Sequence, residues 1–182
     1  MSVWSLPISA TICGKEYKIN ADFRDVLDVI GYLSDSSRPE FLRWQIAINL
    51  FYEDDIPQEH QLEAMEFLGK FISYETEGAK PGPKLFDWNA DAKMIVADIN
   101  KVAGFEVRSV PFLHWWTFLS YFNGIGEGQL STVVSIRSKK AKGKKLEKWE
   151  QEFYRENKDA IDLKKPETEE VKEEKANILK YL

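Results

Sequence analysis

Few residues of this chain carry the side chains on which enzyme chemistry depends. There are two histidines, His60 and His114, and one cysteine, Cys13. His114 lies in the stretch VPFLHWWTFLSYFNG beside Trp115 and Trp116, where a histidine between aromatic walls could form a ligand site. A catalytic histidine also needs an orienting carboxylate and a nucleophile or metal ion, and the sequence offers none at an indicative spacing. We therefore expect no catalytic residue, no metal site and no cofactor.

Two other patterns resemble binding sites but have simpler explanations. Glu53, Asp54 and Asp55 could hold a cation, but a helix junction with one capping residue and two solvated charges explains them better. The GIGEG stretch at Gly124 to Gly128 is rich in glycine, yet no apolar strand precedes it and no P-loop lysine follows it. We expect a turn between two helices there rather than a phosphate site.

The aromatic stretch is better explained by packing or by contact with another protein. Its spacing predicts a helix that is apolar on most faces, and such helices are normally buried. Trp and Tyr are also enriched at the centres of protein interfaces, and adjacent residues diverge by about 100° around a helix. One indole could therefore face the core and the other a partner. The candidate partner-binding residues of this helix are Trp115, Trp116 and Tyr121.

A second candidate surface lies nearer the C-terminus. Leu146, Trp149 and Phe153 are spaced by three and four residues on a predicted helix that is otherwise charged. This stripe follows the lysine-rich stretch SKKAKGKK, and it could pack on its own domain or in the groove of a partner. Both alternatives stay open. A nucleic-acid role for the lysines is not favoured, because no aromatic residues that could stack on bases are interleaved with them.

The composition restricts the class of protein. Hydrophobic residues make up 43% of the 182 residues and charged residues 30%, which suffices for a sizeable core. The net charge of −5 argues against a general nucleic-acid binder. No apolar run approaches the roughly 20 residues that span a bilayer, and the N-terminal stretch lacks the pattern of a secretory signal. We expect a cytoplasmic protein that binds neither nucleic acid nor membranes.

The elements that must position these residues are mostly helical. Two short extended runs around Gly14-Lys15 predict a hairpin with a type II′ turn, and apolar residues at helical spacing follow through most of the chain. The predicted fold is mainly α, with a compact helical domain over 1–137 that includes the N-terminal β-hairpin. Glycines and prolines predict a mobile loop over 73–86 that divides this domain into two halves. Residues 138–182 are expected to form a lysine-rich linker and a charged C-terminal tail, either helical or disordered.

Polar residues near the predicted helix ends are assigned as caps, and glycine and proline as the residues that stop or start a helix. The assignments, in chain order, are Asn20, the pair Ser37 and Glu40, Asp55, Asp87 or Asn89, Gly104 as a helix end, and Pro111 as a helix start.

Four stretches of the sequence together resemble a known family. EYKINADFR, DWNADAKMIVADINKVAGFEV, LHWWTFLSYFNGI and VVSIR, in this order, resemble the bacteriophage gene product fifteen family over roughly Tyr17 to Arg137. The most specific signal is the pairing of Asp87 and Asp91 at a helix start with His114 to Trp116, followed by a helix that ends in arginine.

The resemblance implies a small, helical, non-enzymatic protein of phage tail morphogenesis. The role it favours is a tail-assembly chaperone in the host cytoplasm, which keeps the long tape-measure protein soluble while the tail tube polymerises around it. The implied partners are the tape-measure protein and the tail tube protein, and self-association into a homo-oligomer stays open. The alternative is a structural component that remains in the virion as a tail or connector protein, with the hairpin adding to a neighbour's sheet.

Overall fold

The computed structural model describes residues 4–74 and 82–163. Within these residues the chain forms eight α-helices, two 3₁₀ turns and one antiparallel hairpin, so the prediction of a mainly α fold is confirmed. The hairpin consists of β1 (Ser9–Ile12) and β2 (Lys15–Lys18). The helices and 3₁₀ turns are α1 Phe23–Ser34, α2 Glu40–Phe51, η1 Gln58–His60, α3 Gln61–Ile72, α4 Ala92–Ala103, η2 Val107–Ser109, α5 Trp115–Asn123, α6 Gln129–Ala141, α7 Lys148–Glu156 and α8 Lys158–Ile161.

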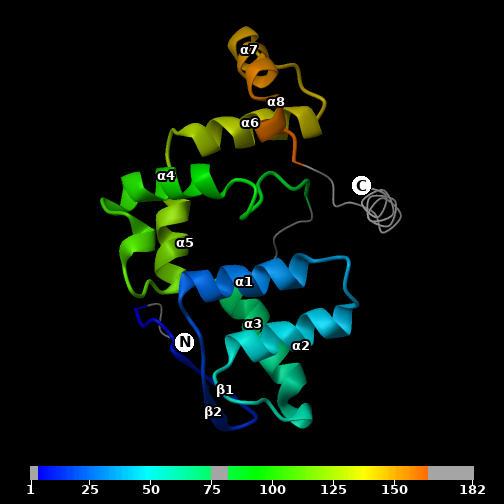
Figure 1. Cartoon of the computed structure of the whole chain (residues 1–182), viewed down its shortest axis with the longest axis vertical. Coiled ribbons are helices and arrows are strands. Elements are labelled where there is room, and N and C mark those ends of the chain that lie inside the picture. The colour runs from blue at the N-terminus through cyan, green and yellow to red at the C-terminus, as the bar shows by residue number, and fades with distance from the viewer. Residues whose placement is uncertain (1–3, 75–81, 164–182) are drawn as a thin grey trace, which may run out of the picture.

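The elements follow one another along the long axis of the molecule (Figure 1). The hairpin and helices α1, α2 and α3 form one end, α4 and α5 lie in the middle, and α6, α7 and α8 form the other end. Residues 82–87, which overlap the loop predicted over 73–86, form neither helix nor strand. The rest of that loop, at 75–81, and the tail predicted beyond 163 lie outside the described residues.

The hairpin turn differs from the prediction. Ile12 pairs with Lys15, so the two turn residues are Cys13 and Gly14, with φ angles of 47° and 77°. Positive φ at both central positions is typical of a type I′ turn, and the predicted type II′ turn starting at Gly14 is therefore wrong. The buried side chains of Ile12 and Tyr17 place one face of the hairpin in the core.

Aromatic rings from distant parts of the sequence form the centre of the core. The ring centroid of Phe71 in α3 lies 5.0 Å from that of Phe51 in α2 and 5.5 Å from that of Trp116 in α5. The rings of Phe23 in α1 and Phe118 in α5 are stacked at 4.5 Å. The two halves of the chain before and after residues 75–81 therefore share one hydrophobic core.

Several helix starts differ from the sequence assignments. The N-cap of α1 is Asp22, whose carboxylate accepts a hydrogen bond from the backbone N–H of Arg24, and not Asn20. Pro39 holds the N-cap position of α2, where no side-chain bond is made. The predicted capping box is absent because Ser37 donates to the carboxylate of Asp35 instead.

Of the remaining assignments of helix starts and ends, three are wrong and one is confirmed. Pro57 and His60 hold the N-cap positions of η1 and α3, which excludes Asp55 from both. Asp87 accepts hydrogen bonds from Asn89 and Ala90 in a turn that precedes α4, whose own N-cap is Asp91. The aromatic helix begins after His114 and not at Pro111. Gly104 ends α4 with a φ of 78°, and this prediction is confirmed.

The C-terminal helices pack on the domain instead of following a linker. Helix α6 continues through Ala141, so the boundary predicted at residue 137 lies inside a helix. Lys139 of α6 pairs with Glu150 of α7 at 2.7 Å, and Lys140 pairs with Asp162 at 2.5 Å. Ile161 is completely buried. The first lysines of the basic stretch therefore hold the last described helices in place, because Lys139 pairs with a carboxylate in α7 and Lys140 with the carboxylate that follows α8.

Candidate functional site

His114 is a structural residue at the start of α5. It is buried, and its Nδ1 accepts a hydrogen bond from the backbone N–H of Trp116 at 3.0 Å. A ring whose Nδ1 accepts carries its proton on Nε2 when neutral, and Nε2 lies 2.9 Å from the carbonyl oxygen of Pro7. Burial also holds the pKa of His114 below its ordinary value. Both ring nitrogens are engaged by the backbone, so neither is free to act on a ligand in this conformation.

Both tryptophans of the aromatic stretch face the core. Trp115 is 1% exposed and Trp116 is 4% exposed. Their indole N–H groups donate to the carbonyl oxygens of Ile72 and Phe71, at 3.1 Å and 2.9 Å. The expectation that one of these indoles faces a partner is therefore wrong. The end of α3 accepts both N–H groups, which allows two adjacent residues to be buried together despite their divergence around the helix.

The other four predicted contact residues are more exposed than the two tryptophans, each to a different extent. Tyr121 is half-buried beside the ring of Phe105, with centroids 6.2 Å apart. Leu146 and Phe153 are half-buried and pack against the core, while Trp149 between them is 57% exposed. The amphipathic stripe thus packs largely on its own domain. Partner binding by Tyr121 and by the exposed part of the stripe stays a prediction.

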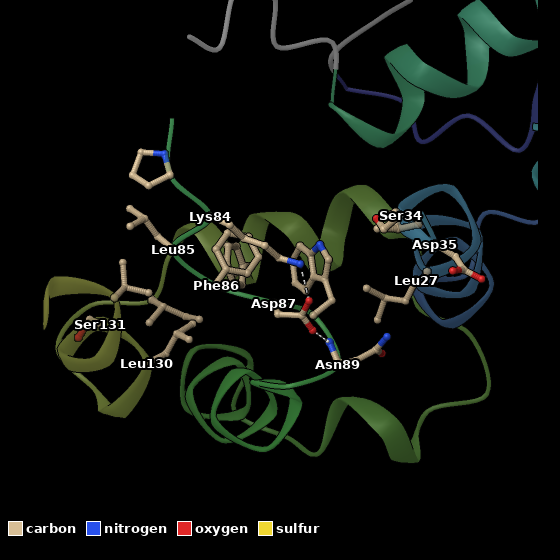
Figure 2. Close-up of a pocket in the computed structure, with 17 residues that line it drawn as sticks. Leu27, Ser34, Asp35, Lys84, Leu85, Phe86, Asp87, Asn89, Leu130 and Ser131 are labelled. Atoms are coloured by element: carbon tan, nitrogen blue, oxygen red, sulfur yellow. Dashed lines mark hydrogen bonds and ion pairs between the residues drawn. The ribbon is translucent and has the colours of Figure 1, made fainter. Parts of the chain in front are cut away.

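A concave surface lies elsewhere, in a groove of about 940 Å³. Figure 2 shows residues 84–89 crossing from α6 to α1, with Phe86 and Leu27 among the side chains that surround the hollow. Every one of its principal apolar side chains except Leu130 is only partly buried. These side chains come from α1, the 82–89 segment, the end of α5 and α6, and they are Leu27, Ile30, Phe86, Trp88, Phe122, Ile125, Leu130 and Val134. We call this surface the α1–α6 groove.

Polar residues lie along the rim of the α1–α6 groove. Lys84 pairs with Asp87 at 2.5 Å, and Ser34, Asp35 and Asn89 lie toward the α1 end (Figure 2). Burial tends to raise the pKa of Asp87, but hydrogen bonds from the Ala90 N–H and the Lys84 ammonium outweigh it, so that the pKa lies below its usual value. The groove therefore combines an apolar interior with charged and amide groups at its edge, as ligand-binding clefts commonly do.

One buried arginine holds the wall of the α1–α6 groove. Arg137 donates to both carboxylate oxygens of Asp91, at 2.6 Å and 2.9 Å, and to the carbonyl oxygen of Leu85 at 3.0 Å. Its remaining donors reach the carbonyl oxygens of Ala160 and Ile161. All five N–H donors of the guanidinium are thus used. Asp91 also accepts from the backbone N–H of Asp87 at 2.9 Å, which fixes the segment that carries Phe86 and Trp88.

A second buried carboxylate holds α6 against α4. Asp98 of α4 accepts a hydrogen bond from the backbone N–H of Leu130 at 2.9 Å, at the N-terminus of α6. A Cβ atom added to Gly128 would lie 2.6 Å from the Asp98 carboxylate. The GIGEG stretch therefore turns closely around an internal anion, and the glycine at 128 gives that anion access to the helix start.

Neither the groove nor the rest of the described chain offers the ligands of a metal site. Among residues 4–74 and 82–163, no group of three or more His, Cys, Asp or Glu side chains is placed to hold a metal ion. Across the same residues, none of the helices has the length and apolar character needed to cross a membrane. The chemistry that the α1–α6 groove can perform is the binding of apolar side chains, with orientation set by the polar rim.

Sequence reasoning did not single out the residues of this groove. Leu27 and Ile30 belong to the apolar residues at helical spacing that predict a helix, and Phe86 and Trp88 lie at the edge of a predicted loop. None of the six predicted contact residues lines the groove. A signal was present in KLFDWN, where two aromatic residues lie in a segment without helical or strand periodicity. Their position between two helices became visible only with the tertiary contacts.

Comparison with known proteins identifies the family. No curated protein and no solved structure matches the chain at the significance required. A family model described as Bacteriophage Gp15 protein matches residues 4–163, which is most of the chain. The stretches that carried the resemblance hold the structure together: Asp22 caps α1, Asp91 binds Arg137, and His114 caps α5. The chain belongs to the bacteriophage Gp15 family and is a phage structural or morphogenesis protein.

Proposed function

We propose that this protein is a non-enzymatic tail-assembly chaperone, which binds an apolar helical segment of the tape-measure protein in the α1–α6 groove within the host cytoplasm. The observation that carries the proposal is the groove itself: an open apolar surface on a phage structural or morphogenesis protein, whose side chains pack against the core on one side and stay partly exposed on the other. A chaperone of this kind has to bind apolar side chains of its client without burying them irreversibly.

The shape and lining of the groove suit one face of an amphipathic helix. Such a helix presents side chains at positions i, i+3, i+4 and i+7, and a volume of about 940 Å³ accommodates several of them. Burial of one aliphatic or aromatic side chain is worth about 1.5–3 kcal/mol. Two or three client side chains in the groove would offset the cost of association and still leave a complex that dissociates when the tail tube forms.

The charge of the chain supports the same role. The net charge is −5, and the described surface outside the groove carries many ionised side chains. Like charges on separate copies repel each other, so that chaperone molecules bound along one client would stay apart and the complex would stay dispersed.

Co-expression with the tape-measure protein tests the proposal. The full chain should increase the soluble fraction of the tape-measure protein severalfold, and Leu27→Asp, on the groove wall, should remove most of this gain because it places a charge against an apolar ligand. Leu62→Asp is the matched control, since Leu62 on α3 is 72% exposed and does not line the groove. Equal loss in both variants, with folding intact, would refute the assignment of the groove.

Mass spectrometry of purified phage particles tests the alternative of a virion component. A chaperone should be absent from finished particles, because its client is then enclosed by the tail tube. Recovery of the protein at a fixed, high copy number per particle would replace the chaperone proposal with a structural role.

A further inference from the structure

The α1–α6 groove has a candidate ligand within the chain itself. The stretch that follows Leu163 begins with KKPETEEVKEEKAN, in which Val171 is the only large apolar residue. The last five residues differ sharply, because four of them are apolar: Ile178, Leu179, Tyr181 and Leu182. In a helix, residues 178, 181 and 182 stand at positions i, i+3 and i+4 and share one face. This is the side-chain pattern that the groove suits.

The structure brings the start of this stretch to the edge of the groove. Arg137 donates to the carbonyl oxygen of Ile161 at 2.6 Å and, from the same guanidinium, to that of Leu85 at 3.0 Å. Leu85 lines the groove. One side chain therefore contacts both the last turn of described helix and the groove wall, and Figure 1 shows α8 lying against α6.

Further contacts keep the point of departure in place. Asp162 accepts a hydrogen bond from the Tyr154 hydroxyl at 2.7 Å and pairs with Lys140 of α6 at 2.5 Å. Val134, on the groove wall, precedes Arg137 by three residues and so lies on the same side of α6. The chain thus leaves the described structure beside α6, within about two helical turns of Val134.

The length of chain that follows is sufficient for it to return. Fourteen residues lie between Leu163 and Ile178, and the fifteen steps along the chain, at roughly 3.3 Å each, can span about 50 Å. A tether of this length keeps a ligand at an effective concentration on the order of millimolar. Even a weak apolar contact would then be occupied for most of the time.

We propose that residues 178–182 bind in the α1–α6 groove as an internal ligand, and that an external partner must displace them. The proposal rests on the groove being a binding surface, as proposed above, but not on the identity of the external partner. It makes the groove self-protecting: its apolar walls stay covered until a ligand with a longer apolar face competes for them.

Photo-crosslinking in the full chain tests where the terminal residues lie. With Tyr181 replaced by a benzophenone amino acid, irradiation should produce crosslinks within one chain to wall residues such as Leu27, Phe86 or Val134, identified by mass spectrometry. The same amino acid in place of the exposed Trp149 should not reach them. Crosslinks only to other surfaces, crosslinks between copies, or no crosslink at all would overturn the proposal.

Competition provides a second, independent test. The double variant Leu179→Asp and Leu182→Asp should bind the tape-measure protein roughly tenfold more tightly, which is the gain expected if about nine-tenths of the grooves are self-occupied. The variant Thr168→Asp and Val171→Asp adds the same charge outside the apolar cluster and should leave affinity unchanged. Equal affinity of both variants would overturn the inference. If no variant binds the tape-measure protein while the groove crosslinks persist, the proposed function fails and the inference stands.

Discussion

Two aromatic regions of this molecule have opposite accessibility. Around α5, Trp115 and Trp116 are buried and both indole N–H groups are satisfied by carbonyl oxygens at the end of α3. In the α1–α6 groove, Phe86, Trp88 and Phe122 contact one another with ring centroids 4.8–5.2 Å apart but remain partly exposed. The first region completes the core, and the second lines a groove at the surface of the molecule.

The difference shows that aromatic content alone does not indicate a binding surface. Helix α5 packs against α1 and α4 and bonds to the end of α3, whereas the segment over 82–89 has helices on its flanks and a hollow on its open side. That segment is held by polar contacts to Asp91 and Arg137, which do not require its side chains to be buried. Rings in the groove are therefore positioned without being enclosed.

Replacement of one ring in each region should separate their roles most strongly. Trp116→Ala should lower the free energy of unfolding by about 3–5 kcal/mol, because it leaves a cavity and removes the hydrogen bond to the Phe71 carbonyl. Phe86→Ala should cost less than half as much, because its ring is already partly exposed. Urea denaturation of both variants measures the difference. Equal costs would contradict the distinction between core and groove.

Loss of Arg137 should test whether polar contacts hold the groove wall. Arg137→Met leaves the buried Asp91 carboxylate without its cation and should cost about 3–5 kcal/mol. The double variant Asp91→Leu and Arg137→Met should be more stable than this single variant, since no unpaired charge remains. Thermal unfolding measures both. A double variant less stable than the single one would mean that the pair contributes through packing and not through charge.

The start of α6, which carries Leu130 of the groove lining, can be probed through the glycines that precede it. Gly128→Ala would bring a Cβ atom within 2.6 Å of the Asp98 carboxylate and should destabilise the protein by about 1–3 kcal/mol. Gly126→Ala is the matched control in the same turn, because nothing lies within 4 Å of its added Cβ atom. Differential scanning calorimetry should show a lower Tm only for the first. A matching decrease at Gly126 would attribute the effect to the turn and not to Asp98.

The smallest expected effect concerns pH and the histidine of the core. Burial lowers the pKa of His114, so the folded protein favours the neutral ring while the unfolded chain takes up a proton below about pH 6.5. The contribution of the neutral His114 ring to stability is therefore fully present above that pH, and the free energy of unfolding should decrease as the pH falls toward 5. His114→Asn, which can still cap α5, should show a weaker decrease over this window. Every other residue is common to both proteins, so the comparison of their unfolding free energies isolates the contribution of His114.

Much of the fold follows from local features of the sequence. Helical periodicity predicted helices through most of the chain, and Val26, Leu68 and Ile99 on the apolar faces of α1, α3 and α4 are buried. Gly104 was recognised as a helix end because a left-handed residue there is nearly always glycine. Helix starts were harder, because several polar residues near each start can cap it. Which of these residues caps the helix depends on contacts from other parts of the chain. The Asp22 carboxylate, for example, also accepts a hydrogen bond from the backbone N–H of Leu113.

The groove could not be predicted in the same way. Its walls come from α1, the 82–89 segment, α5 and α6. The periodicity of the sequence predicts each helix separately and does not show where the packed elements leave a hollow between them. Similarly, Leu146 and Phe153 packing on their own domain was one of two open alternatives, and the pairing of Lys139 with Glu150 favoured it. Contacts between residues far apart in the chain decided both cases.

By itself, the sequence determined the helical class, the family resemblance and the apolar character of the stretch from Val110 to Gly124, since these depend on residue types and their spacing. Only the tertiary structure decided that His114 is a cap, that both tryptophans are enclosed and that the accessible aromatic rings lie around Phe86 and Trp88. The physical reason is that exposure depends on which elements pack over a side chain, and this packing is set by buried polar contacts such as Asp91 to Arg137 across 46 residues of sequence.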